Sequence, residues 1–195
     1  MKSIEIKGTA RTIAERSSAQ ARALKQIRRN GGVPCVLYGG SEVVHFTVSN
    51  DSLRGLIYTP NIYLVNLVID NKPYKAVLKD AQFHPVKENV LHVDFYEITE
   101  NKPIVMEVPV QLEGLPEGVK AGGKLTQQMR KIKTKALYNL IPERLVVNVS
   151  HLGLGKTIKV GDLSFEGLEL ISAKESVVCA VKLTRVARGM AAAAE

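Results

Sequence analysis

His92 and Asp94 are the two residues whose types and spacing could most readily do chemistry. They alternate with apolar residues in the run Val90–Tyr96, which is typical of a β-strand, so both are expected on one face together with Tyr96. The opposite face, directed at the core, is expected to hold Leu91, Val93 and Phe95. An imidazole beside a carboxylate can bind a divalent metal, form part of a nucleophilic triad, or contact RNA by ring stacking and hydrogen bonding.

The two enzymatic interpretations are the weaker ones. A metal triad would need His84, which ends a strand or begins a turn, so only His92 and Asp94 share a face. No Ser or Cys lies in a nucleophile-elbow sequence, and Cys35 and Cys179 lack the paired spacing of a zinc site or a disulfide framework. We expect no metal, no cofactor and no catalysis, and keep a metal-dependent or hydrolytic enzyme using His84, His92 and Asp94 as the less favoured alternative.

A glycine-rich segment, Leu152–Thr157, resembles the end of a phosphate-binding P-loop because it contains Gly-Lys-Thr. The first glycine of that motif would fall on Ser150, and residues 158–162 are typical of a strand rather than of a helix whose N-terminus could hold phosphate. The segment therefore predicts an ordinary turn and no nucleotide hydrolysis.

Basic residues are concentrated in two places. The 195-residue chain has 27 Lys and Arg against 19 Asp and Glu, a formal net charge of +8 that favours polyanionic partners. The first cluster contains one acid, Glu15, and the bases Arg11, Arg16, Arg22, Lys25, Arg28 and Arg29. The second contains no acid and consists of Lys120, Lys124, Arg130, Lys131, Lys133 and Lys135. A run of this kind is also compatible with an ordinary solvated face.

The first cluster falls on a predicted helix and on the loop that enters it. Ser17 or Ser18 can cap its start, apolar positions recur at Ala23, Leu24 and Ile27, and Gly31-Gly32 supplies a C-terminal stop. With Leu24 and Ile27 facing inward, the residues left mostly toward solvent are Arg22, Lys25, Arg28 and Arg29. The sequence therefore predicts a short helix that presents positive charge outward.

The rest of the chain is dominated by strand patterns, so we expect a mainly β protein with short helices. Strands are predicted at residues 3–7, 43–48, 63–69, 74–78 and 90–96, and then at 104–108, 132–137, 145–149 and 177–181. Asp70–Pro73 predicts a hairpin turn, and a second short helix is expected to begin near Asn50 and end before Pro60.

Turn residues at Thr99–Pro103 predict a domain boundary. We expect a first domain at residues 1–98, a second β-rich domain at 103–184, and a mobile tail at 185–195. The N-terminus has no secretory pattern, and no apolar run approaches the roughly 20 residues that span a bilayer, so we expect a cytoplasmic protein with no membrane partner.

Three segments in order carry a family resemblance. They are Ile27–Gly40 (IRRNGGVPCVLYGG), Lys79–Lys87 (KDAQFHPVK) and Leu91–Phe95 (LHVDF). Together they resemble the bacterial large-subunit ribosomal protein family that binds 5S rRNA, in its long, two-domain form related to the general stress protein Ctc. Segments that resemble the second domain of that form follow at 108–110, 118–123 and 141–143.

The resemblance implies an N-terminal β-barrel that docks on 5S rRNA, a β-rich C-terminal domain, and a structural role as a monomer within the large ribosomal subunit. It also implies RNA-facing roles for Arg28, Arg29, Tyr38, Gln82, His92 and Asp94. Residues 11–25 depart from the family pattern. Arg11 is favoured over Arg16 as the counterpart of the family's first-strand arginine because it directly follows the first predicted strand.

The full set of candidate RNA-binding residues is Arg11, Arg16, Arg22, Lys25, Arg28, Arg29, Tyr38, Gln82, His84, His92 and Asp94. A tRNA anticodon-reading barrel would use the same charge and stacking chemistry and is the other RNA-binding alternative. The second basic cluster predicts a contact with ribosomal RNA or with a neighbouring ribosomal protein, and the sequence does not choose between them.

Overall fold

The computed structural model describes residues 2–12, 18–99 and 102–185. The chain divides into two compact units, Met1–Lys102 and Pro103–Glu195. The fold is mainly strands with a few short helices, as predicted, with a closed six-stranded barrel in the first unit and two further sheets in the second. Of the tail predicted to be mobile, residues 186–195 lie outside the described residues.

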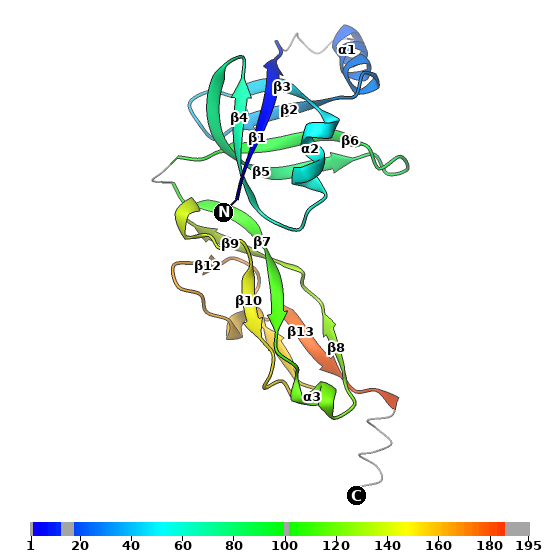
Figure 1. Ribbon diagram of the computed structural model, residues 1–195, viewed down its shortest axis with the longest axis vertical. Helices are drawn as coiled ribbons and strands as arrows, with labels where there is room; N and C mark the ends of the chain where they lie inside the picture. The colour runs from blue at the N-terminus through cyan, green and yellow to red at the C-terminus, as the bar shows by residue number, and fades with distance from the viewer. Residues whose placement is uncertain (1, 13–17, 100–101, 186–195) are drawn as a thin grey trace, which may run out of the picture. The chain divides into compact units, whose positions relative to one another are not determined.

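The first unit is a barrel whose strands follow the order β1-β3-β2-β6-β5-β4 (Figure 1). The strands are β1 (Lys2–Ala10), β2 (Gly32–Tyr38), β3 (Val44–Ser49), β4 (Tyr63–Ile69), β5 (Lys72–Phe83) and β6 (Val90–Glu97). β1 runs parallel to β4 and β2 runs parallel to β6, whereas the other neighbours are antiparallel. Closure leaves the barrel without a free sheet edge.

The turn between β4 and β5 is tighter than the predicted four-residue segment. Asp70 and Asn71, with φ of 45° and 69°, form a two-residue loop, and Ile69 pairs with Lys72. Positive φ at both central residues is the type I′ geometry that matches the twist of a hairpin. Beyond it, β5 continues five residues past the predicted strand, to Phe83.

Strand β2 was not predicted from the strand pattern, because Gly31-Gly32 and Pro34 are typical of a break. In the structure Val33, Cys35 and Leu37 point into the core, and β2 pairs with both β3 and β6. Pairing with β6 begins only at Cys35, so Pro34 replaces none of those rungs.

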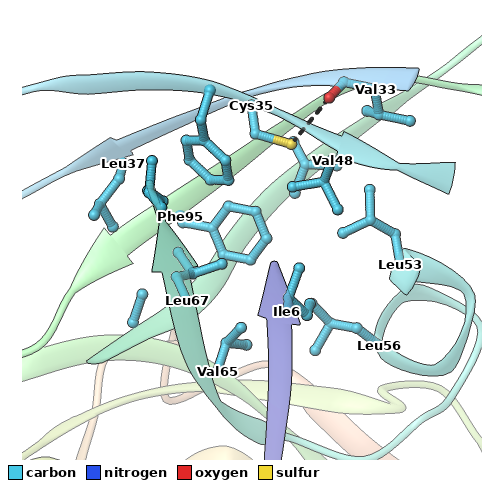
Figure 2. Close-up of a cluster of buried hydrophobic side chains, with 14 of the residues drawn as sticks. Ile6, Val33, Cys35, Leu37, Val48, Leu53, Leu56, Val65, Leu67 and Phe95 are labelled. Carbon is cyan, nitrogen blue, oxygen red and sulfur yellow. Dashed lines mark hydrogen bonds between the residues drawn. The ribbon is translucent and has the colours of Figure 1, made fainter. Parts of the chain in front are cut away.

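The barrel core contains two phenylalanines, Phe46 and Phe95, whose ring centroids lie 5.8 Å apart. Figure 2 shows the Phe95 ring among the other core side chains. Helix α2 (Asn50–Ile57), at the predicted position, buries Leu53 and Leu56 against this cluster. Gly8 allows β1 to approach closely, because a Cβ there would lie 2.7 Å from the Phe46 ring. Truncating either ring to alanine would cost about 3–5 kcal/mol of folding free energy.

Helix α1 (Ser18–Arg29) confirms the predicted basic helix, and none of its residues from Gln20 to Arg29 is fully buried. Only Leu24 and Ile27 are half-buried on the face predicted to be apolar, whereas Ala23 is exposed. Ile27 packs on Gly32, where a Cβ would lie 2.9 Å from the Ile27 methyl carbon. Gly31, with φ of 77°, ends the helix as predicted, and Ser17 lies outside the described residues.

The second unit contains two sheets, ordered β10-β7-β9-β12 and β11-β13-β8. Its strands are β7 (Ile104–Glu113), β8 (Lys124–Gln127), β9 (Lys131–Ala136), β10 (Leu145–Asn148), β11 (Thr157–Lys159), β12 (Glu169–Leu170) and β13 (Val177–Lys182). Its short helices are α3 (Glu117–Lys120), η1 (Tyr138–Leu140) and η2 (Val160–Asp162). The four predicted strands are confirmed, and two short strands, β8 and β12, were missed. The strand expected at residues 158–162 overlaps β11 and is wrong beyond Lys159, where η2 begins.

No helix within the described residues is long and apolar enough to cross a membrane.

Candidate nucleic-acid interface

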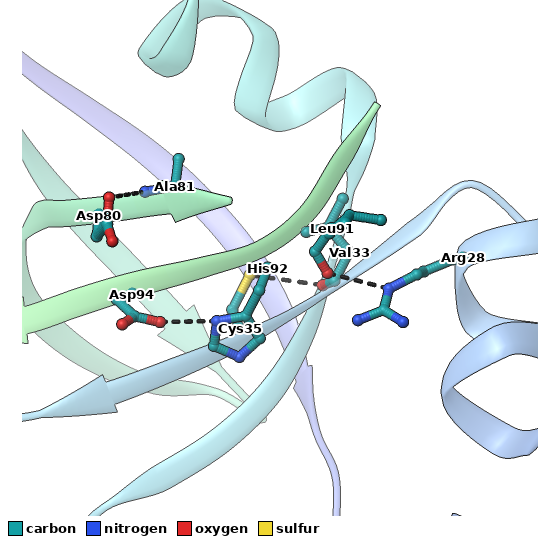
Figure 3. Close-up of polar contacts among 8 residues, drawn as sticks. All are labelled: Arg28, Val33, Cys35, Asp80, Ala81, Leu91, His92 and Asp94. Atoms are coloured by element: carbon teal, nitrogen blue, oxygen red, sulfur yellow. Dashed lines mark hydrogen bonds and ion pairs between the residues drawn. The ribbon is translucent and has the colours of Figure 1, made fainter. Parts of the chain in front are cut away.

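His92 and Asp94 form a direct pair on the outer side of β6. The imidazole Nδ1 lies 2.7 Å from the Asp94 carboxylate, and the two side chains are 24% and 30% exposed (Figure 3). Val93 and Phe95, between and beyond them, are buried, as the alternation predicted. Nδ1–H donates to the carboxylate, which leaves Nε2 of the ring for a contact outside the pair. His92 and Asp94 therefore hold each other in fixed orientations at a partly exposed surface.

A β-bulge at Leu91 brings the basic helix to this pair. Gln82 pairs with His92 and Phe83 with Val90, so Leu91 is an extra residue in β6. Val90 takes the core position, 5% exposed, and the prediction that Leu91 lies in the core is wrong because the bulge shifts the alternation by one residue. The Leu91 carbonyl accepts a hydrogen bond from Arg28 Nε at 3.0 Å (Figure 3).

Arg28 joins α1 to the outward-facing side chains of β6, His92 and Asp94, which form the centre of what is here called the polar strip. Because Nε is used on Leu91, the two terminal nitrogens of the guanidinium remain available for a bidentate contact with a phosphate. On helical spacing the other exposed basic residues of α1, Arg22, Lys25 and Arg29, lie on the side opposite Leu24 and Ile27. Arg16, also a candidate, lies outside the described residues.

Arg11 and His45 extend the strip to β3. The Arg11 backbone N–H donates to the His45 carbonyl at 2.9 Å, and Arg11 Nε and His45 Nδ1 are buried without a hydrogen-bond partner among the described residues. Burial lowers the pKa of Arg11, and Arg28 lowers it further. Burial also lowers the pKa of His45, helped by the charges of Arg11 and His92. Arg11 is thus within electrostatic reach of Arg28 and His45, and His45 is within reach of His92.

Sequence reasoning missed His45. The alternation in Val43–Val48 could have placed it outward, since Phe46 beside it is buried. The alternation alone did not show that β3 and β6 both flank β2. In the structure Val36 pairs with His45 on one side and with Asp94 on the other. Only that register brings His45 into the same strip as Asp94.

The strip ends in two tyrosines. Tyr38 on β2 pairs with Tyr96 on β6, and their rings meet edge to face with centroids 5.7 Å apart. Burial raises the pKa of Tyr38, and the carboxylates of Asp94 and Asp80 raise it further, so the phenol stays protonated. Lys102 Nζ lies 5.6 Å from the Tyr96 ring centroid, which adds a cation at this end.

Gln82 and His84 occupy different positions on β5. Gln82 is exposed and lies opposite His92 in the β5–β6 pair. His84 begins the turn between these strands, where its Nδ1 accepts hydrogen bonds from the backbone N–H groups of Val86 and Lys87 at 3.2 and 3.1 Å. That nitrogen holds the turn, which leaves Nε2 for any external contact.

The metal and nucleophile interpretations gain no support from this geometry. Within the described parts of the chain, no three His, Cys, Asp or Glu side chains gather as metal ligands. Cys35 lies beneath the strip, buried, with its thiol 3.5 Å from the Val33 carbonyl. Burial raises the pKa of Cys35 to about 12, which disfavours the reactive thiolate. The strip combines cations, fixed polar groups and aromatic rings, which is chemistry suited to folded RNA.

Comparison with known proteins places this chain among ribosomal proteins. Residues 9–95 match the model of the Ribosomal L25p family, and residues 103–185 match that of Ribosomal protein TL5, C-terminal domain. A protein named Large ribosomal subunit protein bL25 from Bacteroides thetaiotaomicron is 80% identical over 194 residues, covering 100% of this chain and 99% of its own length. Proteins of the same name from Phocaeicola vulgatus and Porphyromonas gingivalis are 64% and 55% identical and cover 100% and 98% of this chain, and 99% and 98% of their own lengths.

The chain is therefore a bacterial ribosomal protein of the two-domain type. It belongs to the Ribosomal L25p family, in the long form that carries a TL5-type C-terminal domain.

Proposed function

We propose that this protein binds 5S rRNA through the outer strip of its barrel and the adjoining helix α1. The coarser role follows from the family: the protein is a structural, non-enzymatic component of the large ribosomal subunit, and so of cytoplasmic ribosomes. The observation that carries the proposal is the His92–Asp94 pair beside Arg28, which is locked to the bulge at Leu91. Residues far apart in sequence thus form one continuous surface.

In this proposal the cations provide affinity. Arg28 contacts a phosphate with its free nitrogens, and Arg11 adds a second positive centre at the other side of the strip. Arg22, Lys25 and Arg29, all exposed, neutralise further phosphates along the helix. These contacts fix the orientation of the RNA and do not depend on its sequence.

The polar side chains at the centre of the strip provide selectivity among RNAs. His92 Nε2 accepts a hydrogen bond from a ribose 2′-hydroxyl or a base N–H, and the free oxygen of Asp94 accepts one from a base amino group. Gln82, opposite His92, can donate and accept on a base edge, while Tyr38 offers a ring. An aspartate near phosphates is unfavourable by itself, so its place here requires the His92 partner and a donor on the RNA.

The test is a competition experiment on the full chain. His92→Ala and Asp94→Asn should weaken 5S rRNA binding about tenfold or more, because each leaves a polar group of the RNA unpaired, worth on the order of 1–3 kcal/mol. His151→Ala is the matched control, since His151 is exposed and lies in the second unit. Unlabelled 5S rRNA should displace the labelled complex far better than tRNA does.

Two results would contradict the proposal. Equal displacement by tRNA and 5S rRNA would favour the anticodon-reading alternative. Unchanged 5S affinity in both His92→Ala and Asp94→Asn, with folding intact by circular dichroism, would remove this strip from the RNA interface.

A further inference from the structure

A second basic surface lies in the C-terminal unit, at the end of the sheet β11-β13-β8. It comprises five exposed side chains, here called the sheet-end patch: Lys120, Lys124, Lys156, Lys182 and Arg185. Only Lys120 and Lys124 belong to the basic cluster visible in the sequence. The other three come from segments that the sheet brings alongside.

The pairing of β8 with β13 sets the centre of the patch. Lys124 and Lys182 are direct cross-strand partners, so their side chains leave the same face with Cβ atoms about 5 Å apart. The carbonyl of Lys156 accepts a hydrogen bond from the Val181 N–H at 3.0 Å, which fixes Lys156 on the other side of β13. Three lysines therefore lie on three neighbouring segments.

The remaining two members are tied to the same end of the sheet. Thr184 Oγ1 donates to the Gly122 carbonyl at 2.6 Å, which holds the chain before Arg185 against the turn between α3 and β8. Lys120 ends α3, and the Gly123 N–H donates to the Gly118 carbonyl at 2.8 Å, which closes that turn. The five cations thus belong to segments that meet at one end of the sheet β11-β13-β8.

No ion pair neutralises the patch. The segments 118–124, 150–157 and 176–185 contain no Asp or Glu, the acids Glu117 and Glu175 lie just outside them, and among the described residues none of the five basic side chains forms an ion pair. By contrast, Lys133 pairs with Glu107 at 3.8 Å and Lys135 with Glu169 at 3.2 Å. Like charges placed directly opposite on paired strands destabilise a sheet, so Lys124 and Lys182 require an external anion to be favourable.

The composition of the patch selects among polyanions. Protein interfaces are depleted in Lys and enriched in aromatic residues, whereas this patch has four Lys, and its three segments contain no Phe, Tyr or Trp. Without aromatic residues it also lacks a platform for base stacking. Flexible ammonium groups alone suit phosphate oxygens, which are contacted without regard to sequence.

We propose that the sheet-end patch binds the phosphate backbone of RNA, as a second site separate from the barrel strip. This gives a role to the Gly-Lys-Thr segment that resembled a P-loop. Gly155, with φ of 71°, forms the exposed turn that presents Lys156, and β11 follows it in place of a helix. Lys156 therefore acts as a phosphate contact, with no nucleotide bound.

The test follows the backbone amides of the 15N-labelled full chain during titration with a short RNA duplex of mixed sequence unrelated to 5S rRNA. The amides of Lys124, Lys156 and Lys182 should shift, and they give a Kd for the patch itself. The variant Lys124→Ala/Lys182→Ala should weaken that Kd roughly tenfold and reduce the salt slope by about 2, as expected for two lost phosphate contacts. The matched control, Lys133→Ala/Lys135→Ala, removes two paired lysines and should change little.

Three outcomes would overturn the inference: no shift at the patch amides, equal loss in the two double variants, or binding of polyglutamate at the same sites with equal or higher affinity than RNA. The last result would identify an acidic protein surface as the partner. The inference is independent of 5S binding, because His92→Ala in the full chain should leave the patch titration unchanged. The proposal for the barrel and the proposal for the patch can therefore be contradicted independently of each other.

Discussion

The two basic clusters of this chain look alike in sequence, with six cations each, and differ once the strands are paired. In the barrel unit, Arg28 and Arg11 converge on a strip that also holds the His92–Asp94 pair. In the second unit, Lys133 and Lys135 are paired with cross-strand glutamates, and Lys124 is regrouped with Lys182. The role of a basic cluster therefore depends on strand register, because register decides whether each cation lies beside an acid, another cation or a polar group.

Under the two proposals, the comparison also separates two modes of RNA contact. The barrel strip carries fixed hydrogen-bonding groups and aromatic rings, so it can select an RNA. The sheet-end patch carries only mobile charges, so it can hold RNA without selecting it. Selectivity should reside in the first unit, while the second contributes sequence-independent attachment.

The largest expected effect comes from Val93→Asp. Val93 lies between His92 and Asp94 in the sequence and is fully buried. An unpaired carboxylate at this position should cost several kcal/mol of folding free energy and unfold the barrel. Loss of 5S binding together with the barrel's amide signals, while signals of residues 103–185 persist, would sharpen the distinction between the two units. Asn66→Asp, at an exposed position of β4, is the control and should leave both units folded.

A smaller effect separates two adjacent arginines. Arg28→Ala removes both a phosphate contact and the hydrogen bond to Leu91, so 5S affinity should fall about tenfold, equivalent to 1.4 kcal/mol. Arg29→Ala removes only an exposed charge and should weaken binding a few-fold. Filter binding at one fixed salt concentration measures both. Equal losses would mean that the bulge does not organise the site.

Salt dependence tests the strip as a whole. If about five or six phosphates are contacted, the logarithm of the 5S association constant should fall with the logarithm of salt concentration at a slope of roughly −4 to −5. Truncation after Lys102 should leave the preference for 5S rRNA over tRNA unchanged, since the selective groups all lie in the first unit, while the affinity that the sheet-end patch adds is lost for both RNAs. A flat salt response, or a loss of that preference on truncation, would contradict this division of roles.

Much of the fold follows from local patterns. Alternation identified β6 and its outward pair, and Gly31 marked the end of α1. Strand β2 was not predicted because proline generally interrupts strands. Pro34 is tolerated because the pairing of β2 with β6 begins only at the next residue, Cys35. The bulge at Leu91 and the place of His45 were equally inaccessible, because both depend on register between strands far apart in sequence. Local propensity predicts elements, and long-range pairing decides which side chains meet.

The smallest expected effect is a pH dependence confined to the barrel. The pKa of His45 is lowered from 6.5 by burial, with Arg11 and His92 as the facing groups that add to it. Below about pH 6.5 the unfolded chain takes up a proton that the folded barrel resists, so barrel stability should fall as the pH falls through this range, and the contribution vanishes above it.

His45→Gln should reduce this pH dependence because it removes the titrating group while keeping a polar side chain. The measurement is the barrel melting temperature at pH 7.5 and pH 5.5 for both proteins. His151→Gln is the control, since His151 is exposed in the second unit and should leave the barrel's dependence as it is. If His45→Gln retains the full wild-type drop, acid sensitivity arises elsewhere, and the cationic surroundings assigned to His45 on β3 would not act on its proton.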